Sequence, residues 1–238
     1  MSTYVMSDIH GEYQACLKML EKINFSNGDK LYVLGDTLDR GKNPVTLYLD
    51  LEKRENVCGI LGNHEYMALE CLEDLIKPIT YESIDSLTGG EIEKICAWQL
   101  NGGVFTTDEF HKLSDADKRL FIRYLYKSDF LAEAAVGGRD YVLVHAGLDN
   151  FSPERPLGSY SADELIWHSP DYDTVYFEDK YLVTGHLPTA FIEDNPRSNK
   201  IFRKNNHIAI DCGASQGGNL GCLRLDDDKE FYIPCGSF

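Results

Sequence analysis

The sequence predicts an α/β fold, in which strands and helices alternate along the chain. Within the first 65 residues, three short apolar runs at 4–6, 31–34 and 57–61 each lead into a turn of glycine and metal-ligating side chains. Apolar residues at helical spacing separate these runs, which predicts a βαβαβ series and a parallel sheet. Ligands bind outside the carboxyl ends of the strands in such sheets, so the turns are the expected site.

Length and composition indicate one globular domain. The 238 residues are enough for a single well-buried core. The formal net charge of −16 disfavours a nucleic acid polymer or an anionic membrane as partner. No apolar run is long enough to cross a bilayer, and the first residues resemble no secretory signal, so we expect a cytoplasmic protein.

Cysteine usage agrees with that compartment. The chain has seven cysteines, an odd count, and no Cys-x-x-Cys pair. We expect small buried side chains such as Cys16 and Cys58 in a reducing environment, and neither a disulfide framework nor a zinc knuckle.

Each crossover between the first three strands contains one expected helix. Apolar residues recur at helical spacing over 12–23, after Gly11. The second helix runs over 45–53, after Asn43-Pro44, because proline is favoured in the first helical turn.

The chain becomes helical in character after residue 65. We expect helices over 67–76, 91–100 and 114–126, the last capped by Ser114. Paired glycines separate them. We therefore predict a helical cap insertion at about 66–130 that lies over the site, within a single domain of residues 1–238. Trp98 in this insertion, and Trp167 beyond it, are expected to pack and not to bind substrate.

Strand character returns after residue 130. The runs at 131–136 and 141–144 flank a glycine-rich turn over 137–140, which predicts a hairpin. Further short strands are expected at 181–184, 200–203, 208–211, 221–225 and 230–233.

Six residues with oxygen or imidazole ligands stand at the ends of expected strands. If those ends meet at one edge, the side chains gather at one point, and mixed oxygen and nitrogen ligands suit a pair of divalent metals. A lone histidine in such a place is more often structural, but this many together make chance implausible. The residues are Asp8, His10, Asp36, Asn63, His145 and His186.

The blocks around these residues resemble the motifs of a known family. Asp8-Ile9-His10-Gly11, Gly35-Asp36-Thr37-Leu38-Asp39-Arg40-Gly41 and Gly62-Asn63-His64-Glu65 are similar to the three signature blocks of the calcineurin-like metallophosphoesterase superfamily, in its phosphoprotein phosphatase branch with the bacterial serine/threonine protein phosphatases. His145-Ala146-Gly147-Leu148 and Gly185-His186-Leu187-Pro188-Thr189 resemble its downstream motifs, and 210–220 its C-terminal strand. The resemblance implies a metallophosphoesterase fold: four α/β/β/α layers around a β-sandwich of mixed sheets.

The resemblance also implies roles for the ligands. Asp8 and His10 would bind one metal, Asp36 would bridge, and Asn63, His145 and His186 would complete the second. A hydroxide that bridges the two ions would attack phosphorus directly. Manganese is the expected metal, with iron, zinc or cobalt also compatible with this ligand set.

Three further residues receive roles from the same resemblance. His64 would act as general acid on the leaving group, with Asp39 to orient it. Arg40, together with Asn63, would bind the phosphate. A turn-stabilising ion pair is the alternative for Asp39 and Arg40, but their place beside the expected metal bridge favours the functional roles. Glu65 is expected only to start a helix.

The main departure from the family pattern lies after Trp167, and two smaller ones are Ser7 in place of the usual glycine and Leu38 in place of the usual valine. Many bacterial phosphatases of this branch carry a second phosphate-binding arginine two residues after the tryptophan that corresponds to Trp167, and here Ser169 stands there. Arg155 lies at a position that does not match. The second phosphate clamp is therefore missing or supplied from elsewhere.

Three functions follow as hypotheses. The main one is a metal-dependent phosphomonoesterase of the serine/threonine protein phosphatase type, which acts on phosphorylated proteins or small phosphate esters. The alternative is a symmetrical diadenosine tetraphosphate hydrolase, which shares these blocks and needs no second arginine. The third is a non-catalytic scaffold, which the complete ligand set disfavours. The sequence leaves the substrate, the oligomeric state and the role of the cap open.

Overall fold

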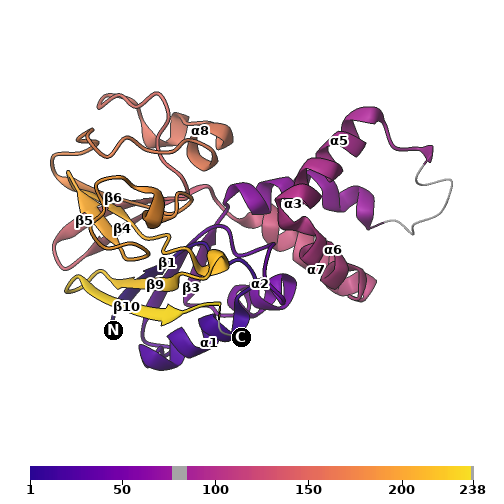
Figure 1. Ribbon diagram of the computed structural model, residues 1–238, viewed down its shortest axis with the longest axis horizontal. Helices are drawn as coiled ribbons and strands as arrows, with labels where there is room; N and C mark the ends of the chain where they lie inside the picture. The colour runs from indigo at the N-terminus through magenta and orange to yellow at the C-terminus, as the bar shows by residue number, and fades with distance from the viewer. Residues whose placement is uncertain (77–84, 237–238) are drawn as a thin grey trace.

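The computed structural model describes residues 1–76 and 85–236, and its centre is a pair of five-stranded sheets (Figure 1). The first sheet has the order β10-β9-β1-β2-β3. Its strands β1 to β3 are parallel, as the βαβαβ pattern predicts, and β9 joins β1 antiparallel. The bounds are β1 (Thr3–Met6), β2 (Lys30–Leu34), β3 (Val57–Ile60), β9 (Asn219–Arg224) and β10 (Lys229–Pro234).

The second sheet has the order β4-β5-β6-β8-β7 and is also mixed. The antiparallel hairpin β4–β5 turns through Gly137 and Gly138, both at positive φ, which confirms the expected glycine-rich turn. Strands β5, β6 and β8 are parallel to one another. The bounds are β4 (Leu131–Val136), β5 (Arg139–Val144), β6 (Lys180–Thr184), β7 (Phe202–Lys204) and β8 (His207–Ala209).

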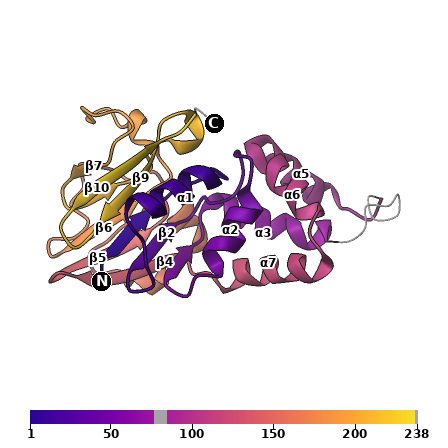
Figure 2. The same ribbon diagram turned by 90° about the horizontal axis from the view of Figure 1, so that it is seen from below.

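Apolar side chains between the sheets form the central core. Val5 and Tyr32 of the first sheet pack against Leu143 and Val183 of the second. The outer face of the first sheet is covered by α1 (Tyr13–Lys22) and α2 (Pro44–Glu52), and that of the second by α8 (Ala162–Ile166) and nearby loops. Figure 2 shows α1 and α2 in front of the first sheet. The expected four-layer α/β/β/α fold is therefore confirmed.

In the described part of the chain, four more helices form a separate group beside the sheets, on the right of Figure 1. They share one apolar cluster, in which Trp98, Phe110 and Phe121 are fully buried and which also includes residues of α2. The region after residue 65 is thus largely helical, as expected, while its role as a cap stays a prediction. The helices are α3 (Asn63–Leu75), α5 (Gly89–Trp98), α6 (Val104–His111) and α7 (Asp115–Lys127).

Two helix boundaries differ from the sequence prediction. Helix α3 begins at Asn63, four residues before the expected start, so its first turn contains the ligand motif itself. The helix expected over 91–100 ends at Trp98, and the segment Gln99–Gly103 joins it to α6, a further helix. Gly102 has a non-helical φ of 107° in this segment, so the paired glycines break the helix there, as the sequence predicts. Ser114 caps α7 as predicted, by accepting the N–H of Asp117.

None of the seven cysteines, all of which lie in the described part of the chain, forms a disulfide. Cys16 is buried, as expected, whereas Cys58, also expected to be buried, is partly exposed, and Cys96 on α5 is exposed. Among the described residues, no helix is both long and apolar enough to span a membrane.

Candidate metal centre

The turns after β1, β2 and β3 meet at the carboxyl edge of the first sheet. Three backbone hydrogen bonds join the first two turns: the N–H of Asp8 donates to the carbonyl of Gly35 (3.1 Å), that of His10 to Asp36 (2.9 Å) and that of Gly11 to Thr37 (2.9 Å). The third turn approaches so closely that a Cβ on Gly62 would overlap a carboxylate oxygen of Asp36. Glycine is therefore required where the third block meets the second.

The second sheet brings two histidines to the same point. His145 follows β5 and His186 follows β6. Two groups of ligand atoms result, one from His10, Asp36 and His64 and one from Asp36, His145 and His186, and within each group the atoms lie within 4.8 Å of one another. Asp36 belongs to both groups, as a bridging carboxylate would.

The remaining two expected ligands lie beside these groups. The Oδ1 atom of Asn63 is 2.9 Å from Nε2 of His145 and 3.1 Å from Nδ1 of His186. Asp8 joins neither group in the described part of the chain, because its carboxylate accepts the N–H of His186 (3.0 Å) and the hydroxyl of Ser7. The structure therefore brings all six residues to one place, with Asp8 at its margin.

The imidazole rings are oriented by backbone carbonyls. Nδ1 of His10 lies 2.8 Å from the carbonyl of Leu38, and Nδ1 of His145 lies 2.7 Å from that of Leu34. The backbone at Trp167 hydrogen-bonds to the ring of His186. Each ring is therefore held with its other nitrogen facing the cluster. Metal-binding histidines usually donate the N–H of the nitrogen that does not bind the metal to a carbonyl or carboxylate in this way.

The ligand turns share an unusual backbone conformation. Of the residues that the structure describes, twelve other than glycine have positive φ, and six of these are site residues. The other six are asparagines and an aspartate, which tolerate this region, whereas histidine and arginine seldom adopt it. Such strain concentrates at functional sites. The six are Asp8, His10, Asp36, Asp39, Arg40 and His186.

Glu65 does more than start a helix, which corrects the sequence interpretation. Its buried carboxylate accepts four backbone N–H groups, three from the turn after β2 and one from Gly62. The three include Asp36, at 2.7 Å. One side chain thus ties the Asp36 turn to the first turn of α3. The available signal in the sequence was the position of Glu65 directly after Asn63 and His64, since an acidic side chain buried there needs hydrogen-bond donors.

His64 and Asp39 form a buried pair. Nδ1 of His64 lies 2.6 Å from Oδ2 of Asp39, and both side chains are almost fully enclosed. Burial lowers the pKa of His64 to about 3 and raises the pKa of Asp39 to about 7. Both shifts have the same main cause, the cost of placing a charge in a dry environment.

Two residues of the helical region also bind Asp39, and sequence reasoning missed both roles. The indole N–H of Trp98 donates to Oδ2 (2.8 Å), and the hydroxyl of Thr106 donates to Oδ1 (2.5 Å). Trp98 packs, as expected, but it also makes a polar contact with the site. The available signal was the Gly102-Gly103 pair between these residues, which marks a close approach of backbone.

Arg40 lies against the imidazole rings of the cluster. Its guanidinium donates to Nε2 of His10 and to Nε2 of His64, both at 2.9 Å. Its backbone N–H donates to the carbonyl of Gly102, at 3.1 Å. The expected phosphate-binding arginine therefore stands between the metal-ligand cluster and the general-acid candidate.

Buried negative charge at the site calls for cations. Asp8, Asp36 and Asp211 are all buried, and burial raises the pKa of each, with that of Asp211 at about 6. The carboxylates of Asp36 and Asp211 each raise the pKa of Asp8 further. Uncompensated buried carboxylates are costly, and oriented imidazoles are neutral metal ligands, so the donor set fits divalent metal ions. Asp211 was part of a recognised motif but had received no role.

The segment around Trp167 differs from expectation. The Trp167 side chain is 45% exposed and does not pack in a core. Arg155 is held by two 2.8 Å hydrogen bonds to Glu164 and lies over the ring of Tyr160. Arg155 is therefore engaged away from the metal cluster and does not replace the arginine absent at Ser169.

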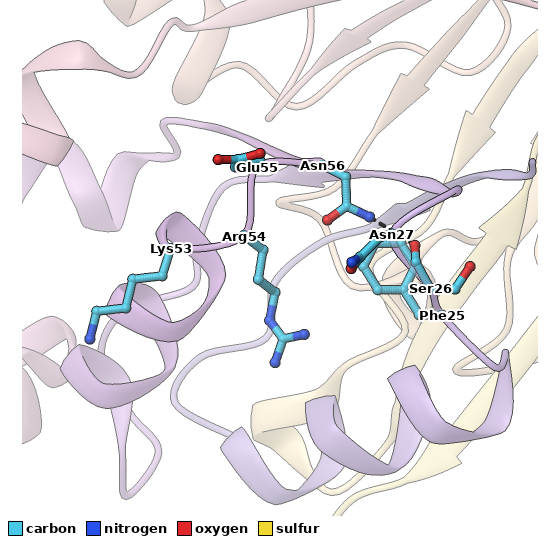
Figure 3. Close-up of a pocket in the computed structure, with 7 residues that line it drawn as sticks. All are labelled: Phe25, Ser26, Asn27, Lys53, Arg54, Glu55 and Asn56. Atoms are coloured by element: carbon cyan, nitrogen blue, oxygen red, sulfur yellow. Dashed lines mark hydrogen bonds between the residues drawn. The ribbon is translucent and has the colours of Figure 1, made fainter.

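A polar cavity of about 630 Å³ lies elsewhere on the molecule (Figure 3). It is lined by the connections that precede β2 and β3, 25–27 and 53–56. Those connections are at the amino ends of the strands, so the cavity lies at the opposite edge of the sheet from the metal-ligand turns. Arg54, which lines it, is paired with Asp50.

Comparison with known proteins agrees with this architecture. The model of the family described as calcineurin-like phosphoesterase matches residues 1–211. The crystal structure of a candidate diadenosine tetraphosphatase superposes with a TM-score of 0.67 at 16% identity, over 99% of this chain and 94% of that one. At this identity the likeness concerns the fold.

Two curated relatives align over almost their whole length. A symmetrical bis(5'-nucleosyl)-tetraphosphatase of Buchnera aphidicola is 32% identical, over 97% of each chain. Serine/threonine-protein phosphatase 2 of Escherichia coli K12 is 28% identical, over 93% of this chain and 92% of that protein. With its two-sheet fold and its histidine and aspartate metal site, the chain belongs to the calcineurin-like phosphoesterase family, and it is a metallophosphoesterase hydrolase.

Proposed function

We propose that the site binds two divalent ions through the six residues named from the sequence. Asp8 and His10 would hold one ion, Asn63, His145 and His186 the other, and Asp36 both. The two overlapping ligand groups around Asp36 support this arrangement. Bound there, such ions supply an activated water and polarise the phosphoryl oxygens. Manganese is the proposed metal, and metal analysis of the purified protein tests it.

The chain's own residues would position the substrate and the leaving group. Arg40 stands where its guanidinium can turn from the imidazoles onto phosphate oxygens in a bidentate contact. His64 would donate a proton to the departing oxygen from Nε2 in its protonated, imidazolium form, because Nδ1 is engaged with Asp39. Asp39 would fix the ring orientation and favour that charged form.

Within the family we propose symmetrical dinucleoside tetraphosphates, such as diadenosine tetraphosphate, as the substrate. The observation that carries this proposal is the set of symmetrical tetraphosphatases that align over nearly the full length of both chains. Two observations agree with this proposal. Position 169 is a serine, and Arg155 is paired with Glu164, so neither supplies a second arginine to bind a phosphate monoester.

The proposal is tested by product analysis. Protein loaded with Mn²⁺ is incubated with diadenosine tetraphosphate, and the products are separated by ion-exchange chromatography. ADP as the single nucleotide product is the expected result. ATP with AMP would contradict symmetrical cleavage, and the absence of ADP would remove this substrate.

A serine/threonine protein phosphatase, the main hypothesis from the sequence, is the second candidate. The full-length alignment with phosphatase 2 of E. coli favours it, as does the His64–Asp39 pair, because a serine alkoxide needs an acid more than ADP does. A phosphoserine peptide assayed beside the dinucleotide decides between them by kcat/KM. A non-catalytic scaffold would hydrolyse neither compound and hold no metal.

A further inference from the structure

We propose that Trp98 and Thr106 are positioning residues for the general acid, which they serve through Asp39. This inference rests on the proposed role of His64 as general acid. It assigns the helical region a part in the chemical step, beyond any role as a cover over the site.

Both oxygens of the Asp39 carboxylate make hydrogen bonds. Oδ2 accepts from Trp98 (2.8 Å) and faces Nδ1 of His64 (2.6 Å), while Oδ1 accepts from Thr106 (2.5 Å). The Thr106 hydroxyl in turn accepts the backbone N–H of Asp39 at 3.0 Å. With both oxygens held, the carboxylate has one orientation, and that orientation places Oδ2 against the imidazole.

Burial makes these contacts hard to replace. The side chains of Asp39, Trp98 and Thr106 have no exposed surface, so solvent does not reach the carboxylate in this arrangement. If one donor is removed, the oxygen loses a hydrogen bond that bulk water does not restore, and the carboxylate gains freedom to rotate. The hydrogen bond to Nδ1 of His64 would weaken as a result.

A bend in the chain lets both donors reach one carboxylate. Trp98 and Thr106 are eight residues apart, which in a straight α-helix separates them by about 12 Å along the axis. Gly102, with a φ of 107°, breaks the helix between them, and the segment Gln99–Gly103 folds back on the indole. A Cβ on Gly103 would lie 2.7 Å from the Trp98 ring, so only glycine permits this bend.

The same segment also contacts Arg40. The Gly102 carbonyl accepts the Arg40 N–H at 3.1 Å, and a Cβ on Gly102 would lie 2.8 Å from Cγ of Arg40. The bend between α5 and α6 therefore supports both Asp39 and Arg40. A helical region that only covered the site would not need buried hydrogen bonds to the polar groups of these two residues.

The test compares leaving groups. Trp98→Phe and Thr106→Val each remove one hydrogen-bond donor to Asp39 and keep most of the side-chain volume. Thr107→Val is the matched control. The Thr107 hydroxyl donates to the Gly103 carbonyl and accepts from the Gln99 amide, and neither of these bonds involves Asp39. Each Mn²⁺-loaded variant is assayed on phenyl phosphate, a poor leaving group, and on 4-nitrophenyl phosphate, a good one. Metal content and Tm are measured in parallel.

A positioning role predicts a selective loss. We expect Trp98→Phe and Thr106→Val to lower kcat on phenyl phosphate by about tenfold more than on 4-nitrophenyl phosphate, within the range of general-acid effects. Thr107→Val should affect both esters equally. Equal losses in all three variants, while His64→Ala remains selective for the poor leaving group, would overturn the inference. If His64→Ala is not selective either, the assignment of His64 as acid fails instead.

A spectroscopic measurement does not depend on turnover. In protein loaded with diamagnetic Zn²⁺, the proton on Nδ1 of His64 should give a downfield NMR signal that His64→Ala abolishes. Trp98→Phe and Thr106→Val should shift or broaden this signal, and Thr107→Val should leave it in place. An unchanged signal in Trp98→Phe and Thr106→Val would contradict the proposal that these two residues orient the Asp39 carboxylate.

Discussion

The carboxylate of Glu65 accepts the backbone N–H of Asp36 at 2.7 Å, and through this contact helix α3 holds the turn that carries the shared ligand. Three more N–H groups converge on the same carboxylate. The side chain is buried, so these bonds are not shared with solvent. The geometry of the metal centre therefore depends on a residue that touches no expected ligand atom.

Replacing Glu65 with glutamine should weaken both folding and metal binding. Glutamine offers one acceptor oxygen, and its amide group would face N–H donors that then have no acceptor. We expect a loss of about 3 kcal/mol in the free energy of unfolding, measured with urea, and weaker Mn²⁺ binding by calorimetry. Glu55→Gln, at an exposed position, is the control. A Glu65→Gln protein with normal stability would show that the four contacts contribute little.

Metal removal should destabilise the protein, and Asp36→Asn should reduce that effect. The Asp36 carboxylate raises the pKa of its neighbour Asp8, and burial is the largest of the causes that raise the pKa of Asp36 itself. In chelator at pH 8, the neutral asparagine relieves this cost, so Asp36→Asn should melt a few degrees above the wild type. With Mn²⁺ the order should reverse. Equal gains in Tm from Mn²⁺ in both proteins would argue against a shared ligand at 36.

Gly102→Ala should impair phosphate binding more than folding. Its φ of 107° is unfavourable for alanine, and the added Cβ would meet Arg40 at 2.8 Å. We expect Arg40 to be displaced and KM to rise about tenfold, with a smaller change in kcat. Steady-state kinetics on diadenosine tetraphosphate measure the split. Gly90→Ala, which has open space around it, is the control.

The two arginines considered for phosphate binding should behave differently. Arg40 lies in the imidazole cluster, whereas Arg155 is engaged by Glu164. Arg40→Ala should lower kcat/KM by about a hundredfold, the scale of a lost charge-assisted bidentate contact in a dry site. Arg155→Ala should change it less than about twofold. A large loss in Arg155→Ala would identify the missing second clamp and favour the phosphatase hypothesis.

His207 should make stability depend on pH. It is 1% exposed, its ring stacks on Tyr172 and lies edge-on to Tyr176, and Nε2 is 2.8 Å from the hydroxyl of Thr184. Burial lowers its pKa to about 3, while the unfolded chain binds a proton near pH 6.5. The folded state is therefore favoured above pH 6.5, and this advantage is lost as the pH falls toward 3.

The measurement is the difference in unfolding free energy between the wild type and His207→Phe. Between pH 8 and pH 5 this difference should shift against the wild type by roughly 2 kcal/mol, because only the wild type takes up this proton on unfolding. The surrounding groups, Thr184 and the two tyrosines, are uncharged over that range. Parallel curves for the two proteins would place the acid sensitivity in other histidines.

Local signals in the sequence were sufficient for much of the fold. Short apolar runs followed by glycine turns predicted the parallel strands β1 to β3, since both signals depend on neighbouring residues alone. The start of α3 was misplaced because Asn63 and His64 interrupt the apolar spacing, and the structure holds them in a helix through tertiary contacts such as the Glu65 carboxylate. The break at the paired glycines 102 and 103 was predicted, because such a pair ordinarily ends a helix, whereas helix α6 beyond it was not predicted.

The sequence by itself determined the residue types of the site and their places at strand ends, because turn chemistry and ligand chemistry are properties of short segments. The tertiary structure decided which groups support them. Trp98, Thr106 and Glu65 reach Asp39 and Asp36 across separations of 29 to 67 residues. A buried hydrogen bond of this kind leaves no periodicity or spacing in the chain. It exists only once packing has excluded water and left each carboxylate to find its donors within the protein.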